Sequence, residues 1–392
     1  MFSYTLHADL DTNRYLLISD DSAFILSKVL YDLLDKYNEK QNIHDVQFYL
    51  MEKYNEPQYN TEFIRKVLDT VSNKLDKADG DKKIYDFLHY KCTIIKEGAL
   101  KSFFKYSSAL FGKYVFLILM LFSFFSTMYF FIYNDLLSIN SLAVASHEHL
   151  TFSNALLTYF LFFVFIFIHE LGHAGATTYF KLQPKEIGLG FYFIFPVLYT
   201  NVSEIWQLNK AKRNIVNLGG IYYQSLINMI LIGLFFLNDT AGLVFNLIIA
   251  NTLSMLFSLN PFFKYDGYWI LSDSLNIPNL TSKARRMIIQ FIKSPLICIK
   301  SLQEKGGIIL VYSLFQSLFW LYVYFEVYQY LKNIIPQLIE HIHSGFWDME
   351  QKIIFDFFIN TTIMSVVVFF MWLHIISIIR FVRDNLLNRV FV

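Results

Sequence analysis

The sequence predicts a polytopic α-helical membrane protein with a small N-terminal α/β domain on the cytoplasmic side. Of its 392 residues, 55% are hydrophobic and 19% are aromatic, a composition too apolar for a soluble globular domain. The apolar residues are unevenly distributed, because residues 1–112 are polar and charged whereas long hydrophobic runs dominate from Tyr114 onward. Lys and Arg residues gather in alternate loops between these runs, which is typical of membrane proteins.

Six apolar runs are long enough to cross a hydrocarbon layer of roughly 30 Å. They lie at about residues 114–133, 152–176, 214–237, 241–259, 308–331 and 353–379. The loops 135–150 and 238–240 carry no basic residue, whereas 181–213 carries five and 260–306 carries seven. Because basic residues favour the cytoplasmic side, we expect a multi-pass protein with both termini in the cytoplasm.

Charge and cysteine content exclude several other classes of protein. Lys and Arg number 33 against 32 Asp and Glu, so the chain offers no basic surface that would indicate a nucleic-acid partner. Cys92 and Cys298 both fall on the expected cytoplasmic side, where disulfides are rare. Met1–Asp20 has no basic stretch followed by an apolar core, so we expect no signal peptide.

The N-terminal residues 1–80 are predicted to form a small winged-helix-like α/β domain. An extended segment at Tyr15–Ser19 precedes helices near 21–36, 43–54 and 60–76, the first of them capped by Asp20 or Asp21. Winged-helix folds often bind DNA, but nine Lys and Arg against fourteen Asp and Glu over this segment give the wrong sign for a phosphate backbone.

The order of elements in this domain is similar to that of PqqD-like domains. Those domains hold the leader peptides of ribosomally made, modified peptides by adding a peptide strand to a sheet edge. The resemblance implies a candidate peptide-binding domain at 1–80, while a scaffolding or dimerising domain fits the same pattern. Residues 81–113 mix lysines with aromatics and are expected to be an amphipathic connector along the inner membrane face, or else an ordinary basic linker.

The motif His169-Glu170-Leu171-Gly172-His173 lies inside the second apolar run. Two histidines four residues apart lie on the same face of a helix, so both imidazoles can reach one metal beside a glutamate that activates water. Ionisable groups at bilayer depth cost several kcal/mol and are kept mainly where they coordinate, conduct or catalyse. We interpret the motif as half of a zinc site; the alternative is polar groups satisfied by neighbouring helices.

A second motif, Asn260-Pro261-Phe262-Phe263-Lys264-Tyr265-Asp266-Gly267, follows the fourth apolar run. A catalytic zinc site needs three protein ligands and an open position for water, and Asp266 is the candidate for the third. Pro261 breaks the helix so that the chain turns and presents Asp266, and Gly267 is expected to let the backbone take the turn. Both the second and fourth runs end inward, so we expect the two motifs to meet in the cytoplasmic half of the bilayer.

The two motifs, separated by a third span, resemble the site-2 protease family of intramembrane zinc metalloproteases. That family has a core of three helices with HExxH followed by an Asp-Gly motif. The stretches 196–206 and 260–273 further resemble its bacterial peptide zinc metalloprotease branch, which is often associated with peptide bacteriocins. The resemblance covers about 90–280 and implies a bacterial cell membrane protein with Zn²⁺ as its cofactor. It implies that His169, His173 and Asp266 bind zinc and that Glu170 is the general base, within a core at 114–280 followed by a C-terminal transmembrane region at 281–392.

The chain departs from the family pattern between the two motifs. Members commonly have Gly-Pro and an Asn where this chain has Leu218-Gly219-Gly220-Ile221, and the usual Pro-x-Pro is missing after Pro261. These changes bear on the substrate groove more than on the metal. Asn251 and Asn260 are candidate substrate-binding residues, although Asn260 is also suited to hydrogen bonding at a helix end. The apolar segment 188–200 is expected to be a re-entrant hairpin whose edge holds an extended substrate, or a packed apolar loop.

The sequence therefore predicts an intramembrane zinc metalloendopeptidase that cleaves a small membrane-associated peptide, such as a bacteriocin-like precursor. One alternative is regulated intramembrane proteolysis of a single-span regulatory protein; regulatory members often carry a PDZ-type domain, and none is evident in this sequence. A third reading is a non-proteolytic peptide export or immunity protein that keeps a metal site. The intact HExxH motif and Asp266 weigh against that third reading.

Overall fold

The structure is a computed structural model that is mostly helical. It describes residues 4–9, 14–19, 22–56, 58–80, 89–99, 101–138, 152–192, 195–237, 241–300 and 305–344, with seven further residues between 365 and 379. The chain divides into two units, Met1–Pro278 and Asn279–Val392. The first unit contains both predicted motifs.

The N-terminal sheet has three antiparallel strands in the order β1-β2-β3. They are β1 (Tyr4–Asp9), β2 (Arg14–Ser19) and β3 (Ser22–Leu26). The sequence predicted one strand followed by a helix from residue 21, which is wrong for 22–26. Those residues pair with β2, Leu17 opposite Phe24, and the pairing buries Leu26 in the domain core.

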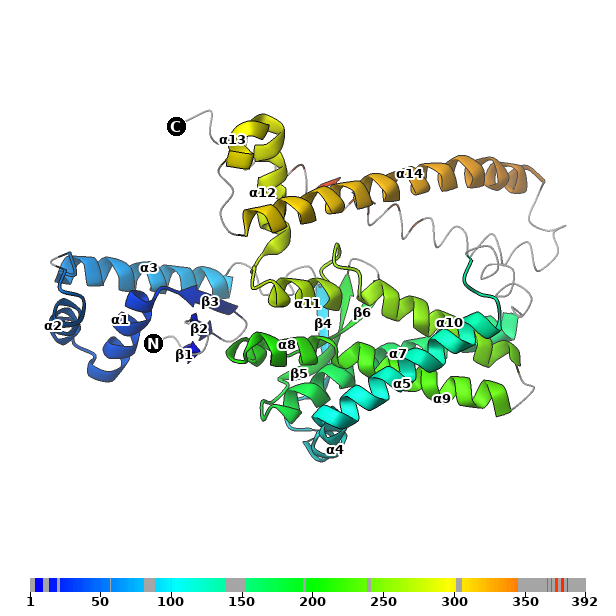
Figure 1. Ribbon diagram of the computed structural model, residues 1–392, viewed down its shortest axis with the longest axis horizontal. Coiled ribbons are helices and arrows are strands. Elements are labelled where there is room, and N and C mark those ends of the chain that lie inside the picture. Colours follow the sequence, from blue (N-terminus) through cyan, green and yellow to red (C-terminus); the bar gives the residue numbers. More distant parts are fainter. Residues whose placement is uncertain are drawn as a thin grey trace. The chain divides into compact units, whose positions relative to one another are not determined.

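Three helices follow the sheet, namely α1 (Lys28–Lys40), α2 (Ile43–Tyr54) and α3 (Thr61–Gly80) (Figure 1). Helix α1 begins after Ser27, whose Oγ accepts the N–H of Leu30 at 3.3 Å. Ser27 is therefore the cap, and the expectation of a cap at Asp20 or Asp21 is wrong. Strands and helices enclose a shared hydrophobic core that includes Leu17, Leu33, Leu34, Val46, Leu50 and Ile64.

The segment predicted as an amphipathic connector, 81–113, contains a strand that the sequence reading did not anticipate. Strand β4 (His89–Lys96) pairs with β5 (Glu186–Tyr192), which lies about ninety residues further along the chain. The pairing begins with Lys96 opposite Glu186. A short helix α4 (Lys101–Ser107) and a 3₁₀ turn η1 (Ser108–Phe111) complete the segment.

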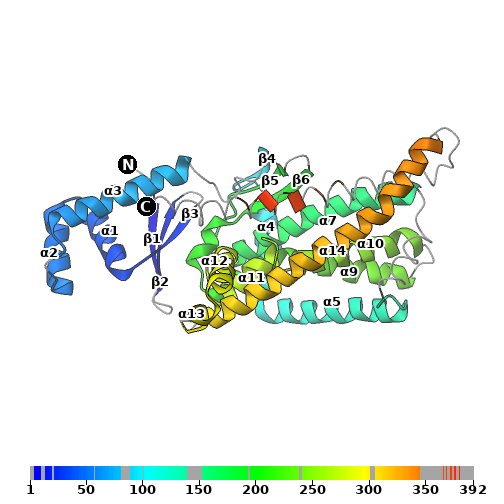
Figure 2. The same ribbon diagram turned by 90° about the horizontal axis from the view of Figure 1, so that it is seen from above.

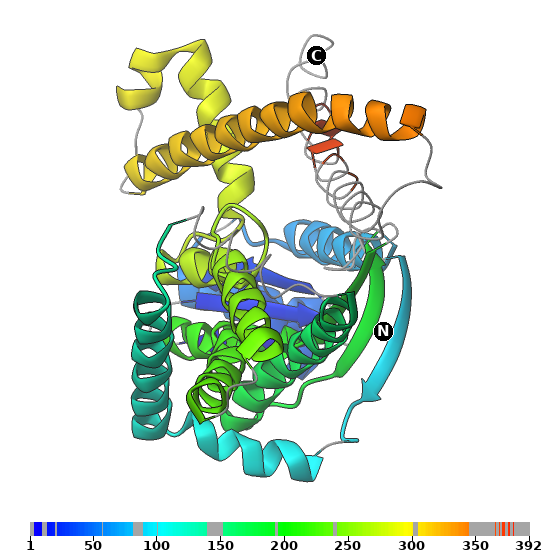
Figure 3. The ribbon, with the colours of Figure 1, turned by 90° about the vertical axis from the view of Figure 1, so that its right-hand side faces the viewer.

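The predicted hairpin at 188–200 is present as strands β5 and β6 (Phe195–Asn201), with Gly188 opposite Tyr199. The second sheet has the order β4-β5-β6, and Figure 3 shows the cyan strand β4 beside the green hairpin.

The third predicted span is divided at Leu218. Helix α8 (Lys210–Asn217) precedes it and helix α9 (Gly219–Leu237) follows it.

Within the described residues, four helices contain stretches long and apolar enough to cross a membrane. They are α5 (Lys113–Tyr133), α7 (Phe152–Tyr179), α9 and α14 (Gly306–Ser344), and α10 (Ala241–Ser258) contains a shorter apolar helix. Helices α5, α7, α9 and α10 run side by side in Figures 1 and 2. The sixth predicted span at 353–379 lies outside the described residues, apart from the seven noted above.

The outer face of α5 carries large apolar side chains. Three of them are about 60% exposed, namely Phe122 (60%), Phe124 (59%) and Phe125 (60%). Contact of such apolar surface with water is unfavourable, whereas lipid tails accommodate it. With the four long apolar helices, this face supports a polytopic helical membrane protein. In the second unit, α12 (Leu280–Lys293) packs against α13 (Pro295–Lys300) and α14.

Candidate metal centre

Helix α7 presents His169 and His173 on one face, as their spacing predicted. Both side chains are buried, and their Nε2 atoms lie 3.1 Å apart. The four-residue interval places the second imidazole one helical turn beyond the first. The helix thus supplies two nitrogen donors to one point.

Asp266 reaches the same point from the first residue of helix α11 (Asp266–Ser274). Between α10 and α11 the chain turns at Pro261, where Asn260 Oδ1 accepts the N–H of Phe262 at 2.9 Å. Gly267 is required by close packing, because a Cβ there would lie 2.0 Å from the carbonyl oxygen of Leu259. The glycine allows the start of α11 to pack directly against the end of α10. It is not needed for a left-handed backbone conformation.

The three donor groups lie close to the spacing of a tetrahedral zinc site, with a different carboxylate oxygen of Asp266 facing each histidine. Nε2 of His169 is 3.1 Å from Oδ2 of Asp266, and Nε2 of His173 is 3.4 Å from Oδ1. Zinc binds nitrogen and carboxylate oxygen at about 2.0–2.2 Å, so neighbouring donors around it lie roughly 3.3–3.5 Å apart. These residues form the one three-donor cluster of His, Cys, Asp or Glu among the described parts of the chain.

Hydrogen bonds to the Nδ1 atoms of both histidines orient their Nε2 atoms toward Asp266. Nδ1 of His173 lies 2.8 Å from the carbonyl oxygen of Val216; a carbonyl only accepts, so Nδ1 carries the proton. Nδ1 of His169 lies 2.9 Å from Oε1 of Gln224, whose Nε2 donates to Asn251 Oδ1 at 3.1 Å. This orientation of the amide makes His169 Nδ1 a donor as well, and each Nε2 keeps a lone pair.

A cation suits this arrangement. Two nitrogen lone pairs and a carboxylate face one another, and Asp266 Oδ2 is buried without a hydrogen-bond partner among the described residues. A buried acceptor without a hydrogen-bond partner destabilises the folded state by about 1–3 kcal/mol, and by more when it is charged. A metal ion between the three groups would neutralise the carboxylate and use both lone pairs. His169, His173 and Asp266 therefore fit zinc in donor type, spacing and burial.

Glycines bring α7 and α9 into direct backbone contact beside the cluster. A Cβ at Gly172 would lie 2.2 Å from the carbonyl oxygen of Gly219, and a Cβ at Gly220 would lie 2.4 Å from Nε2 of His169. Small residues permit such close approach of helices in membranes.

Glu170 is half-buried next to His169 on α7. Its backbone carbonyl accepts a 3.0 Å hydrogen bond from Thr200 Oγ1 of strand β6. The hairpin strand is therefore anchored to the helix at the proposed general base. Among the described strands β6 pairs only with β5, so its other edge is an edge of the sheet.

The two asparagines predicted to bind substrate lie in different surroundings. Asn251 is 0% exposed, and its Nδ2 donates to Gln224 O at 2.9 Å and to Asn228 Oδ1 at 2.7 Å. Asn251 is thus linked to His169 indirectly, because Gln224 hydrogen-bonds to both residues. Asn260 is half-buried and hydrogen-bonded within its own turn, as its helix-end reading expected. A role of either residue in substrate binding stays a prediction.

The sequence did not predict the residues that hydrogen-bond to the candidate metal ligands. Gln224 carries an amide side chain inside an apolar span. Polar side chains are rare in such spans, so its position is a signal that could have identified it. The Val216 carbonyl has no sequence signal, because any residue supplies one. A buried ion pair between Arg213 and Asp273 was also missed, although Asp273 follows Asp266 by two helical turns.

No family model matches the chain, and no solved structure matches it. Over 120 residues, 30% of this chain, the sequence is 31% identical to a Bacillus subtilis (strain 168) protein named "Putative peptide zinc metalloprotease protein YydH". The match covers 46% of that protein, so the chain spans less than half the length of this curated relative. The similarity supports a zinc metalloprotease family, and the donor set of His169, His173 and Asp266 suits the metal in that name.

Proposed function

We propose that this chain is an intramembrane zinc endopeptidase of the site-2 protease type that cleaves a small membrane-associated peptide. The observation that carries the proposal is the buried cluster of His169, His173 and Asp266, with donor spacings of 3.1–3.4 Å. The cluster lies on a helix apolar enough to cross a membrane. A glutamate follows the first ligand, as hydrolysis by a metallopeptidase requires.

Each side chain has a defined part in hydrolysis. Zinc, when bound, acts as a Lewis acid and lowers the pKa of water toward neutrality. Glu170 accepts the proton of the attacking water and passes it to the leaving amine. Val216 and Gln224 hold the imidazoles in the tautomer that leaves both Nε2 atoms available, which is the usual role of partners behind a metal ligand.

Strand β6 is the proposed binding site for the segment of the peptide substrate that is cleaved. A helical peptide shields its amide bonds with its own hydrogen bonds, so it must become extended before water can attack. An extended peptide can pair with the edge of a sheet as a further strand, and Thr200 fixes β6 to the backbone of Glu170. A peptide added to this edge would pass beside the general base.

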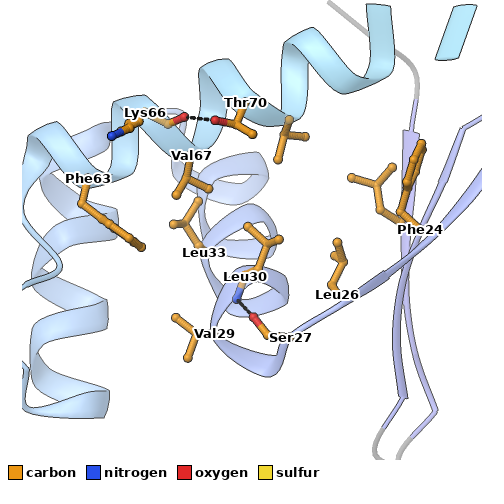
Figure 4. Close-up of a pocket in the computed structure, with 12 residues that line it drawn as sticks. Phe24, Leu26, Ser27, Val29, Leu30, Leu33, Phe63, Lys66, Val67 and Thr70 are labelled. Carbon is orange, nitrogen blue, oxygen red and sulfur yellow. Dashed lines mark hydrogen bonds between the residues drawn. The ribbon is translucent and has the colours of Figure 1, made fainter. Parts of the chain in front are cut away.

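The N-terminal domain is the proposed docking site for a precursor. An apolar cavity of about 600 Å³ lies between the sheet, α1 and α3 (Figure 4). Its lining includes Phe24 and Leu26 of the edge strand β3, Leu30 of α1, and Phe63 and Val67 of α3. A peptide strand added to β3 would place apolar side chains near this cavity, which favours peptide over nucleic acid as partner.

Substitution of Val67 by arginine in the full chain is expected to raise KM for the precursor about tenfold while kcat changes less than twofold. The lining of the cavity shares no residue with the metal cluster, so the cavity is expected to supply binding rather than chemistry. Steady-state cleavage kinetics measure the effect. Phe48→Arg is the matched control, because Phe48 is 72% exposed on the same domain and does not line the cavity. Equal KM values in both variants would remove the cavity from substrate recognition.

The proposed function is tested by comparing membrane-associated peptides in bacteria that make the wild-type chain or His173→Ala. Quantitative mass spectrometry should find at least one peptide that is intact with the variant and cleaved with the wild type. The cleavage should be reproduced by the purified protein in detergent, stopped by a zinc chelator and restored by added zinc. Identical peptide populations in the two strains would contradict the proposal.

A further inference from the structure

A buried ion pair joins α8 to α11, the helix that begins with Asp266. Nε of Arg213 donates to Oδ1 of Asp273 at 2.8 Å, and a second guanidinium nitrogen, Nη2, lies at the same distance. Nδ2 of Asn217 donates to the other carboxylate oxygen at 3.2 Å, and Nη1 of Arg213 donates to Leu208 O at 2.6 Å. The Arg213 and Asp273 residues are only 2% and 7% exposed.

Burial of this pair calls for a role other than simple stability. Removing two charges from water costs several kcal/mol for each ion, and well-packed apolar residues of similar volume often stabilise a fold equally well or better. The pair does constrain geometry, because Nε of Arg213 donates a hydrogen bond to the Asp273 carboxylate while Nη2 forms an ion pair with the same oxygen, so the planar guanidinium holds its partner in one place. The part of the molecule that such a pair would hold in place is the one that carries the third metal donor.

Helix α11 is that part. It has nine residues, and an isolated helix shorter than about 12 residues is marginal. Asp266 is its first residue and Asp273 follows seven residues later, two turns along the same face. The ion pair therefore holds the far end of the helix that carries the third metal donor.

Helix α8 is connected to the metal cluster at two places. Its Val216 carbonyl accepts the hydrogen bond of His173 Nδ1, and its Arg213 binds the helix of Asp266. We infer that Arg213 and Asp273 are positioning residues, which set the carboxylate of Asp266 relative to His173 so that the two bind one zinc ion. This inference deepens the proposed function and rests on its zinc site.

The test measures zinc affinity of the purified full-length chain in detergent by competition with a chromogenic chelator. Arg213→Met and Asp273→Asn are each expected to weaken zinc binding by about 10–100-fold, the range for partners behind metal ligands. Lys210→Met is the matched control, since Lys210 is an exposed cation on the same helix, and its zinc affinity should stay within twofold of wild type. Cobalt substitution adds a second readout, because a displaced carboxylate changes the visible spectrum.

A double variant, Arg213→Met with Asp273→Leu, separates positioning from stability. Apolar replacement of both partners should return the thermal unfolding midpoint of the metal-free protein to the wild-type value or above, while zinc binding stays at least tenfold weaker. Zinc affinity that recovers together with the unfolding midpoint would overturn the inference, as would single variants with wild-type affinity. A wild-type chain that bound no zinc would instead contradict the proposed function itself.

Discussion

Replacement of Glu170 by glutamine is expected to reduce peptide cleavage by about 10²–10⁴-fold, the usual contribution of a general base, while zinc stays bound. Glutamine has nearly the same shape but cannot accept the proton of the attacking water. The proposed metal donors are His169, His173 and Asp266, so their geometry should not depend on the Glu170 carboxylate. The measurement is kcat for the precursor, with zinc content determined on the same samples.

Glu97→Gln is the control for this variant, because Glu97 is an exposed glutamate outside the cluster. It should cleave at the wild-type rate. Cleavage by Glu170→Gln at a rate near that of the control would remove Glu170 from the mechanism. Loss of zinc from Glu170→Gln would instead make Glu170 part of the metal site.

Replacement of Gly172 by alanine is expected to destabilise the helix contact that carries the cluster. The added Cβ would lie 2.2 Å from the carbonyl oxygen and 2.7 Å from the carbonyl carbon of Gly219, which are both backbone atoms. Helices α7 and α9 must therefore move apart, at a cost of about 1–3 kcal/mol for an overpacked core. Because Gly172 lies between the two histidines, zinc affinity should fall at least tenfold together with the thermal unfolding midpoint.

Gly233→Ala on α9 is the matched control for that prediction. Nothing lies within 4 Å of a Cβ built at Gly233, so the same methyl group meets open space there. The unfolding midpoint of this variant should equal or exceed that of wild type, since alanine favours helix by about 1 kcal/mol over glycine. Equal behaviour of the two alanine variants would contradict the close approach of α7 and α9.

The residues of the candidate metal site could be predicted because each depends on a short-range rule. His169 and His173 share a helix face by periodicity alone, and Pro261 ends the helix before Asp266. The alternation of basic and non-basic loops was enough to expect both motifs at the same membrane depth. The structure brings the three residues together, with their donor atoms within 4.8 Å of one another.

Features that depend on distant parts of the chain were not predicted. Strand β4 is defined by its pairing with β5 about ninety residues away, and its own sequence of lysines and apolar residues also suits a linker. Residues 22–26 were assigned to a helix because Phe24 and Leu26 extend the apolar stripe of the helical residues that follow. Their pairing with β2 makes them a strand instead. The Arg213–Asp273 pair joins two short helices sixty residues apart, and no local pattern reveals it.

The zinc content of the purified full-length chain tests the central claim most directly. Three protein donors with an open position for water are the pattern of a catalytic zinc site, so elemental analysis should find about one zinc per wild-type chain. Asp266→Ala removes one donor and should lose most of that zinc while the protein remains helical by circular dichroism. The same zinc content in wild type and Asp266→Ala, or no zinc in the folded wild type after reconstitution with the metal, would contradict the account.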